Sequence, residues 1–181
     1  MPDGHKIARR IRVPMGFVFA AAYIWLARPS VRSIVAGSSI ALVGLVVRAL
    51  ASGHVRKNEQ LTVSGLYAHT RNPLYLGSLI IAAGFAVSAR SWWVALIGAV
   101  IFVTIYIPVM RSEEVFLRAQ FPKFDDYVRQ VPQLFPRVTP YQSSANAFSP
   151  HLYWKHREYN ATIGSVLMIA ALIIKVIWFQ R

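Results

Sequence analysis

The chain has 181 residues, of which 55% are hydrophobic, and its mean hydropathy is +0.42. This composition excludes an ordinary soluble domain and is typical of a small membrane protein. Twenty lysines and arginines oppose 7 acidic residues, for a net charge of +13. In so apolar a chain, anionic lipid headgroups rather than nucleic acid are the expected counter-charge. The absence of cysteine excludes disulfides, thiolate nucleophiles and cysteine-ligated metals.

Five apolar segments approach the length of about 20 residues that a membrane-spanning helix requires. They cover residues 13–27, 33–51, 73–89, 91–109 and 161–179. We therefore predict an all-α integral membrane bundle of about five transmembrane helices. A cleaved signal peptide is the alternative for the short first segment, but its apolar run continues past the three alanines at positions 20–22, which favours a span.

The basic residues predict the orientation of this bundle. With the N-terminus inside, 14 of the 20 lie on the inner side and five on the outer side, while Arg48 lies within a span. This asymmetry agrees with the positive-inside rule. The inner segments 52–72 and 110–160 carry nearly all the acidic residues. We therefore expect a multi-pass protein whose active site faces the cytoplasm.

The turn-forming residues suggest how the chain is divided. Residues 139–150 are rich in serine, asparagine and proline, which is typical of a linker. We predict a functional membrane domain at 1–138 with its core at 44–137, a linker at 139–160, and a C-terminal transmembrane helix at 161–181.

The loop before the third apolar segment carries the first cluster of chemically informative residues. Pro73 suits the first turn of a helix and Asn72 its N-cap, so the positive end of that helix would lie beside Arg71. Such a helix start can bind a carboxylate, and Tyr67 and Tyr75 offer aromatic faces to a purine or a sulfonium. The alternative is an ordinary interfacial helix start that anchors lipid headgroups.

A second cluster, Arg111, Glu113 and Glu114, ends the fourth apolar segment. Adjacent carboxylates are costly there unless they are solvated or paired. Glu114 could pair with Arg118 on a surface helix. In the functional alternative, one glutamate accepts a hydrogen bond from an ammonium group while Arg111 binds a carboxylate.

A third cluster, residues 121–136, is aromatic and punctuated by prolines, and it includes Tyr127. It is too apolar for a plain linker and too interrupted for a span. We expect it to lie on the membrane surface and to cover a pocket built by the other clusters, with a structural re-entry loop as the alternative. The histidines lack zinc-binding spacing, so no metal site is predicted.

In their order and spacing, these three clusters resemble the isoprenylcysteine carboxyl methyltransferase family and the related phospholipid methyltransferases. The resemblance is carried by Gly65, Tyr67, Arg71, Asn72, Pro73, Tyr75 and Gly77, then Glu113 and Glu114, then Tyr127, Val131, Pro132 and Pro136. Asn72 stands where many members have histidine. Gln133 stands where an arginine is common, and Arg129 or Arg137 is the candidate replacement.

The resemblance implies an integral membrane enzyme that uses S-adenosylmethionine, with a cytoplasmic cofactor pocket formed by the ends of the spans and the C-terminal segment. It also explains why the chain lacks a G-x-G-x-x-G motif, because this family does not use the Rossmann fold. The implied cofactor-binding residues are Tyr67, Arg71, Asn72, Pro73, Tyr75 and Tyr127. The implied catalytic residues are Glu113, Glu114 and Arg111.

We expect methylation of a carboxylate on a lipid-borne acceptor, as in protein-S-isoprenylcysteine O-methyltransferases. Such an acceptor is already ionised and needs no base. The alternative is a phospholipid N-methyltransferase, whose amine acceptor must lose a proton to Glu113 or Glu114. A non-catalytic membrane scaffold or small transporter is the alternative of another class. Membrane lipids are expected partners, whereas nucleic acid and metal are not.

Overall fold

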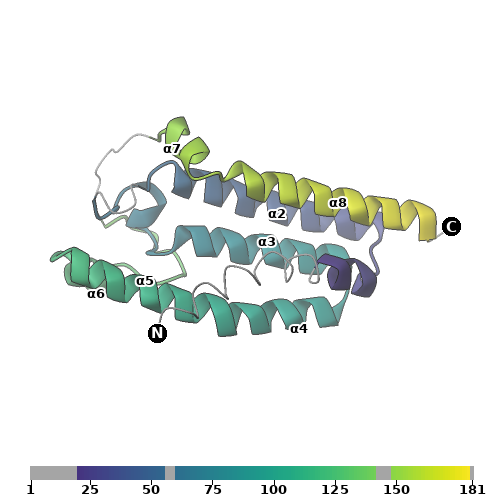
Figure 1. The fold of residues 1–181 in the computed structure, drawn as a ribbon, viewed down its shortest axis with the longest axis horizontal. Helices are drawn as coiled ribbons and strands as arrows, with labels where there is room; N and C mark the ends of the chain where they lie inside the picture. Colours follow the sequence, from purple (N-terminus) through teal and green to yellow (C-terminus); the bar gives the residue numbers. More distant parts are fainter. Residues whose placement is uncertain (1–19, 56–59, 142–147, 180–181) are drawn as a thin grey trace, which may run out of the picture.

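A computed structural model describes residues 20–55, 60–141 and 148–179 of the chain, and within these ranges the regular structure is helical, without strands (Figure 1). The prediction of an all-α fold is therefore confirmed. After a helical segment at residues 20–26, the elements are α2 (Val31–Ser52), η1 (Gly65–Ala68), α3 (Pro73–Ala89), α4 (Trp92–Ile101), η2 (Phe102–Tyr106), α5 (Ile107–Gln120), α6 (Phe124–Gln130), α7 (Pro150–Lys155) and α8 (Tyr159–Phe179).

Three helical stretches in the described ranges are long and apolar enough to cross a membrane, namely Val31–Ser52, Trp92–Gln120 and Tyr159–Phe179. Helix α3 is apolar but shorter, with 17 residues. These helices indicate a membrane protein. The total of five spans stays a prediction, because residues 13–19 of the first predicted span, 13–27, lie outside the described residues.

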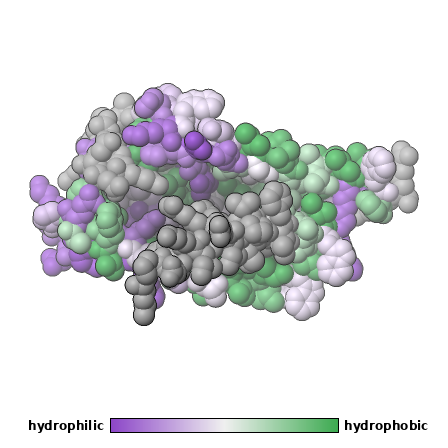
Figure 2. Space-filling view, in the orientation of Figure 1, coloured by the Kyte–Doolittle hydropathy of each residue, from purple (hydrophilic) through white to green (hydrophobic). Residues whose placement is uncertain are grey.

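The long helices alternate in direction along the bundle (Figure 1). Helices α2 and α4–α5 run one way, and α3 and α8 run the other way. The chain between α2 and α3 and the chain between α5 and α8 therefore meet at one end, which we call the polar end. Figure 2 shows hydrophilic residues gathered mostly there, with hydrophobic residues over the rest of the helices. The segments predicted to be cytoplasmic thus share one end of the molecule.

Small residues let α2 and α3 approach closely. A Cβ atom on Gly44 would lie 2.7 Å from the carbonyl oxygen of Gly77, and one on Gly84 would lie 2.6 Å from the amide nitrogen of Ala41. Packing through small residues is the usual way for membrane helices to bring their backbones together. It also brings Arg48, one turn beyond Gly44, directly against α3.

Pro108 interrupts the helical stretch from Trp92 to Gln120. Proline has no amide hydrogen, and its ring clashes with the carbonyl four residues earlier, here that of Thr104. The helix accommodates this by widening into the π-helical turn η2, which ends two residues before the proline. Tyr106 ends this turn, and its ring meets that of Tyr75 on α3 edge-on, with centroids 5.7 Å apart.

The segment after α6 fastens the loop that precedes α3. The amide of Arg71 donates to the carbonyl of Pro132 at 3.0 Å, and the amide of Tyr141 donates to the carbonyl of Ala68 at 2.9 Å. The hydroxyl of Thr70 donates to the carbonyl of Leu134 at 2.9 Å. The third sequence cluster therefore supports the first through its backbone. Its position on the membrane surface stays a prediction.

Candidate active site

A cavity of about 550 Å³ lies at the polar end, between α2, α3, α5 and α6. This volume is within the range of small-molecule sites, roughly 300–1,000 Å³. The charged residues that line it are Arg48, Arg71, Glu113, Glu114 and Glu158. Among the described residues of the lining, three acids against two bases leave a net negative charge, which favours a positively charged ligand.

The ion pair between Arg71 and Glu114 is the most exceptional feature of the cavity. Arg71 Nη1 lies 3.1 Å from Glu114 Oε2, and the two side chains are only 12% and 16% exposed. The atoms are not aligned for a hydrogen bond, and Arg71 Nε, Arg71 Nη1 and Glu114 Oε1 are buried without a hydrogen-bond partner. Each buried polar atom left unpaired costs about 1–3 kcal/mol. A ligand with both an anionic and a cationic group would satisfy all three.

The Glu114–Arg118 pair considered from the sequence does not form. Arg118 Nε donates instead to Asp125 Oδ1 at 2.7 Å, in a pair whose side chains are about half exposed. Glu114 reaches across to Arg71 on the loop before α3. The second cluster therefore contributes a cavity residue rather than a surface pair.

Glu113 and Tyr75 connect α5 to α3 at the rim of the cavity. The Tyr75 hydroxyl donates to Glu113 Oε1 at 2.9 Å. Glu113 itself is exposed. It therefore combines access to solvent with a fixed orientation, as a group that accepts a proton requires.

The start of α3 confirms two sequence predictions and changes the role of one residue. Asn72 stands at the N-cap and Pro73 in the first turn, as predicted. The Asn72 side chain makes no capping bond, however, and its Nδ2 donates to the carbonyl oxygen of Gln133 at 3.0 Å. Gln133 thus contributes its backbone, and Asn72 holds the loop and the third cluster together.

Two buried tyrosines form another part of the wall. The Tyr127 hydroxyl donates to the carbonyl oxygen of Tyr67 at 2.6 Å. Tyr67 belongs to η1, whose first residue Gly65 has φ +57°, a left-handed conformation that glycine adopts most readily. Burial raises the pKa of Tyr67 and of Tyr127 above the usual value, so both are neutral phenols at physiological pH. They offer aromatic faces rather than charge.

The cavity brings together most of the residues proposed from the sequence. Those that line it are Tyr67, Arg71, Asn72, Tyr75, Glu113, Glu114 and Tyr127. Pro73 is buried behind the lining, and Arg111 is exposed and outside it. The suggested replacements for the missing arginine also lie elsewhere. The Arg129 side chain is 80% exposed, and Arg137 donates to the carbonyl oxygen of Gln130 at 2.7 Å.

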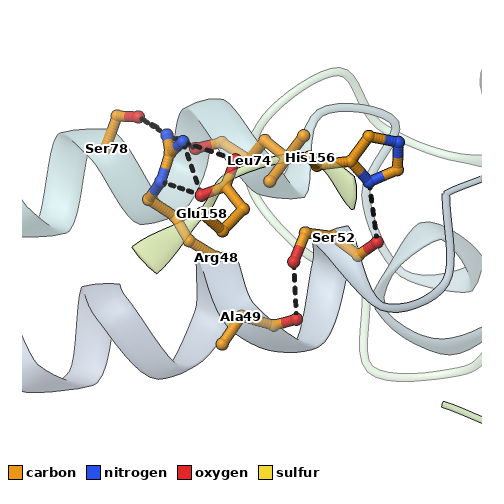
Figure 3. A network of polar contacts seen from close by, with 7 residues as sticks. All are labelled: Arg48, Ala49, Ser52, Leu74, Ser78, His156 and Glu158. Atoms are coloured by element: carbon orange, nitrogen blue, oxygen red, sulfur yellow. Dashed lines mark hydrogen bonds and ion pairs between the residues drawn. The ribbon is translucent and has the colours of Figure 1, made fainter. Parts of the chain in front are cut away.

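Sequence reasoning did not place Arg48 and Glu158 in the site. The sequence places Arg48 within a span and Glu158 in the predicted linker. In the structure they form a two-pronged ion pair at the cavity wall (Figure 3). An arginine within an apolar helix requires a polar or charged partner. That requirement is the feature of the sequence that indicates an ion pair at Arg48. Residues 150–155 of the predicted linker form α7. The domain division stays a prediction.

The fold and the site define a helical membrane protein with a polar cavity at one end. Residues 15–123, more than half of the chain, match the family model described as phospholipid methyltransferase. The chain therefore belongs to this family of membrane methyltransferases, whose members generally use S-adenosylmethionine.

Two curated relatives have names that refer to metal resistance. The cobalt-zinc-cadmium resistance protein CzcN of Cupriavidus metallidurans is 38% identical over 110 residues, and the nickel-cobalt-cadmium resistance protein NccN of Alcaligenes xylosoxydans xylosoxydans is 37% identical over 110 residues. Each alignment covers 60% of this chain and 50% or 51% of the relative. The chain thus spans about half the length of these relatives. No solved structure matches it.

Proposed function

We propose that this protein is an S-adenosylmethionine-dependent methyltransferase that modifies a lipid-borne acceptor. The observation that carries the proposal is the buried Arg71–Glu114 pair, whose guanidinium and carboxylate retain unpaired atoms. The amino-acid end of the cofactor has one carboxylate and one ammonium group. Arg71 would hold the carboxylate, and Glu114 would accept a hydrogen bond from the ammonium.

The remaining lining suits the rest of the same molecule. When bound, the cofactor supplies a methyl group on a positively charged sulfur. The excess of one acid among the described lining residues offsets that charge, and the rings of Tyr67 and Tyr127 provide faces for a purine or a sulfonium. Phe116, Leu117 and Phe121 add apolar surface that excludes water. The chain's contribution to such a reaction is mainly positioning.

The acceptor's chemistry can be argued from the charges of the cavity. A carboxylate acceptor, expected from the sequence, needs a cation. Of the two arginines in the described lining, Arg71 would already hold the cofactor's carboxylate and Arg48 is paired with Glu158. An amine acceptor instead finds Glu113, oriented by Tyr75, as a base for its proton. The arrangement therefore favours an amine headgroup, with isoprenylcysteine-like carboxylates as the second acceptor class. In both cases the apolar bundle would admit the lipid laterally from the membrane.

A non-catalytic role remains the rival function, because the curated relatives are named for metal resistance and not for a reaction. Among residues 20–55, 60–141 and 148–179, no group of three or more metal-binding side chains occurs. The two functions differ in what they require of the cavity, since a scaffold needs neither cofactor nor acceptor.

The test is methyl transfer by the full-length protein in lipid nanodiscs. Methyl-labelled S-adenosylmethionine would be supplied with nanodiscs containing phosphatidylethanolamine, or with a farnesylated cysteine as the carboxylate acceptor. We expect label in the extracted lipid, more on the amine than on the carboxylate, and much less of it with Arg71→Ala. Folded protein that transfers no label to either acceptor would contradict catalysis on these substrates, and absence of cofactor binding would favour the scaffold.

A further inference from the structure

Arg48 and Glu158 form an ion pair at the wall of the cavity, which we call the clasp. Arg48 Nε lies 3.0 Å from Glu158 Oε2, and Nη2 lies 3.0 Å from Oε1 and 2.8 Å from Oε2 (Figure 3). The side chains are 23% and 10% exposed. A planar two-pronged pair of this kind is among the strongest and most directional polar contacts in proteins. It joins α2 to the start of α8, 110 residues further along the chain.

The clasp also holds the first turns of α3. Arg48 Nη1 donates to the carbonyl oxygen of Leu74 at 3.3 Å and to Ser78 Oγ at 2.5 Å (Figure 3). The arginine stem crosses α3 at Gly77, where a Cβ atom would lie 2.6 Å from Arg48 Cγ. Tyr75, which orients Glu113, lies between Leu74 and Ser78 in the sequence. The clasp therefore holds the residue next to Tyr75.

The turn that carries Glu158 is itself docked onto the end of α2. The amide of Ser149 donates to the carbonyl oxygen of Gly53 at 3.0 Å, and His156 Nδ1 lies 3.3 Å from the carbonyl oxygen of Ser52. Arg157 has φ 54°, a left-handed conformation that is uncommon outside glycine. This conformation immediately precedes Glu158 at the start of α8. Several independent contacts thus direct the carboxylate toward Arg48.

The two arginine pairs of the cavity differ in a way that separates their roles. Each guanidinium nitrogen of Arg48 has a hydrogen-bond partner within the protein. Arg71 has buried nitrogens without one. Arg71 is therefore open to a ligand, whereas Arg48 is already committed to the protein. Removing either member of the clasp would leave a charge in the wall without its partner.

We propose that Arg48 and Glu158 are positioning residues for methyl transfer, and that α8 belongs to the active site through Glu158. The clasp fixes the first turns of α3, and with them Arg71, Asn72 and Tyr75. Glu158 lies beyond residues 15–123, which match the family model. This inference rests on the proposed function, since it assigns the clasp a role in the same site.

The test compares five variants of the full-length protein in nanodiscs with the wild type. Glu158→Gln and Arg48→Gln each break the clasp, and the double variant Arg48→Glu with Glu158→Arg reverses it. Asp125→Asn is the matched control, because it removes an exposed ion pair outside the cavity lining. Hydrogen exchange of the peptide covering residues 73–80 reports on the clasp, and the Kd of S-adenosylhomocysteine reports on the site.

We expect both single variants to exchange faster at residues 73–80 and to bind S-adenosylhomocysteine about 10- to 100-fold more weakly. The reversed pair should recover part of both properties, and Asp125→Asn should change neither. Glu158→Asp keeps the charge on a shorter stem, so an intermediate effect is expected even if the neutral variants fold poorly.

Unchanged exchange or unchanged affinity in both single variants would overturn this inference alone, provided that the wild type binds S-adenosylhomocysteine. A folded wild type that binds none would overturn the proposed function and the positioning role with it. Hydrogen exchange is measured without ligand. It therefore distinguishes failure of the positioning role from failure of the proposed function.

Discussion

At the scale of single residues, the site is defined by polar atoms that are buried and unpaired. Arg71 and Glu114 face each other in the cavity, yet two guanidinium nitrogens and one carboxylate oxygen lack hydrogen-bond partners. Buried polar atoms are nearly always satisfied in folded proteins. A pair that is left open at the wall of a cavity is best explained by a ligand that completes it.

Replacing Arg71 tests this explanation directly. Arg71→Ala should weaken S-adenosylhomocysteine binding by about 10- to 100-fold, because a charge-assisted hydrogen bond contributes roughly 1.5–3 kcal/mol. Arg71→Lys keeps the charge but loses the planar fork, so we expect an intermediate affinity. Calorimetric titration measures both, with Arg129→Ala as a control at an exposed arginine. Equal affinity in all four proteins would exclude Arg71 as a cofactor ligand.

Replacing Glu113 should have a different effect, because in the proposed function Glu113 accepts the proton of an amine acceptor. Glu113→Gln should slow transfer to an amine by about 100-fold or more, as loss of a general base does. Transfer to a carboxylate should fall much less, and cofactor affinity should be retained. Turnover measured on matched amine and carboxylate lipids gives the comparison. A uniform loss on both would indicate a positioning role instead.

Residue patterns predicted one part of the site and missed another. The ordered motif identified Tyr67, Arg71, Tyr75 and Glu114, all of which line the cavity. It could not find Glu158, which lies far from the motif in sequence and meets Arg48 only through packing of α8 against α2.

At the scale of elements, the packing of α2 against α3 supports the site. Gly44 faces Gly77 at a distance that leaves no room for a Cβ atom. Any side chain there would separate the helices and displace Arg48 from α3. The interface therefore contributes to the geometry of the cavity as well as to stability.

A matched pair of glycine substitutions tests this packing. Gly44→Ala should destabilise the protein by about 1–3 kcal/mol through overpacking. Gly98→Ala should be neutral or slightly stabilising, because a Cβ atom there meets nothing within 4 Å and alanine favours helix. Thermal unfolding in detergent measures both. If Gly44→Ala unfolded at no lower temperature than Gly98→Ala, the result would contradict the close approach of α2 and α3.

Hydropathy predicted the long helices well and the irregular elements poorly. The segments 33–51, 73–89 and 161–179 agree closely with α2, α3 and α8. The fourth apolar segment ends at residue 109, whereas the helical stretch continues to Gln120. A hydropathy profile does not detect this extension, because its residues are mostly polar. The π-turn before Pro108 depends on a local clash that a hydropathy profile does not register.

At the scale of the whole molecule, alternating helices gather the two polar segments at one end (Figure 1). That end holds the cavity, and its charges form pairs between segments that are distant in sequence. The bias of basic residues predicts that it faces the cytoplasm. An interfacial cavity of this kind would meet a water-soluble cofactor and a membrane-embedded acceptor.

The cysteine-free chain allows a clean test of orientation. Val138 is 94% exposed at the polar end, and Arg90 is exposed at the opposite end. In intact cells, a membrane-impermeant maleimide should label Arg90→Cys, and it should label Val138→Cys only after the cells are permeabilised. The reverse pattern would place the cavity on the outer side.

The central claim is that the cavity binds S-adenosylmethionine, and calorimetric titration of S-adenosylhomocysteine into the purified wild-type protein tests it most directly. The account predicts saturable binding at one site per chain, weakened by Arg71→Ala and unaffected by Arg129→Ala. Folded protein that releases or absorbs no heat of binding, and that equilibrium dialysis with labelled cofactor also finds empty, would contradict it.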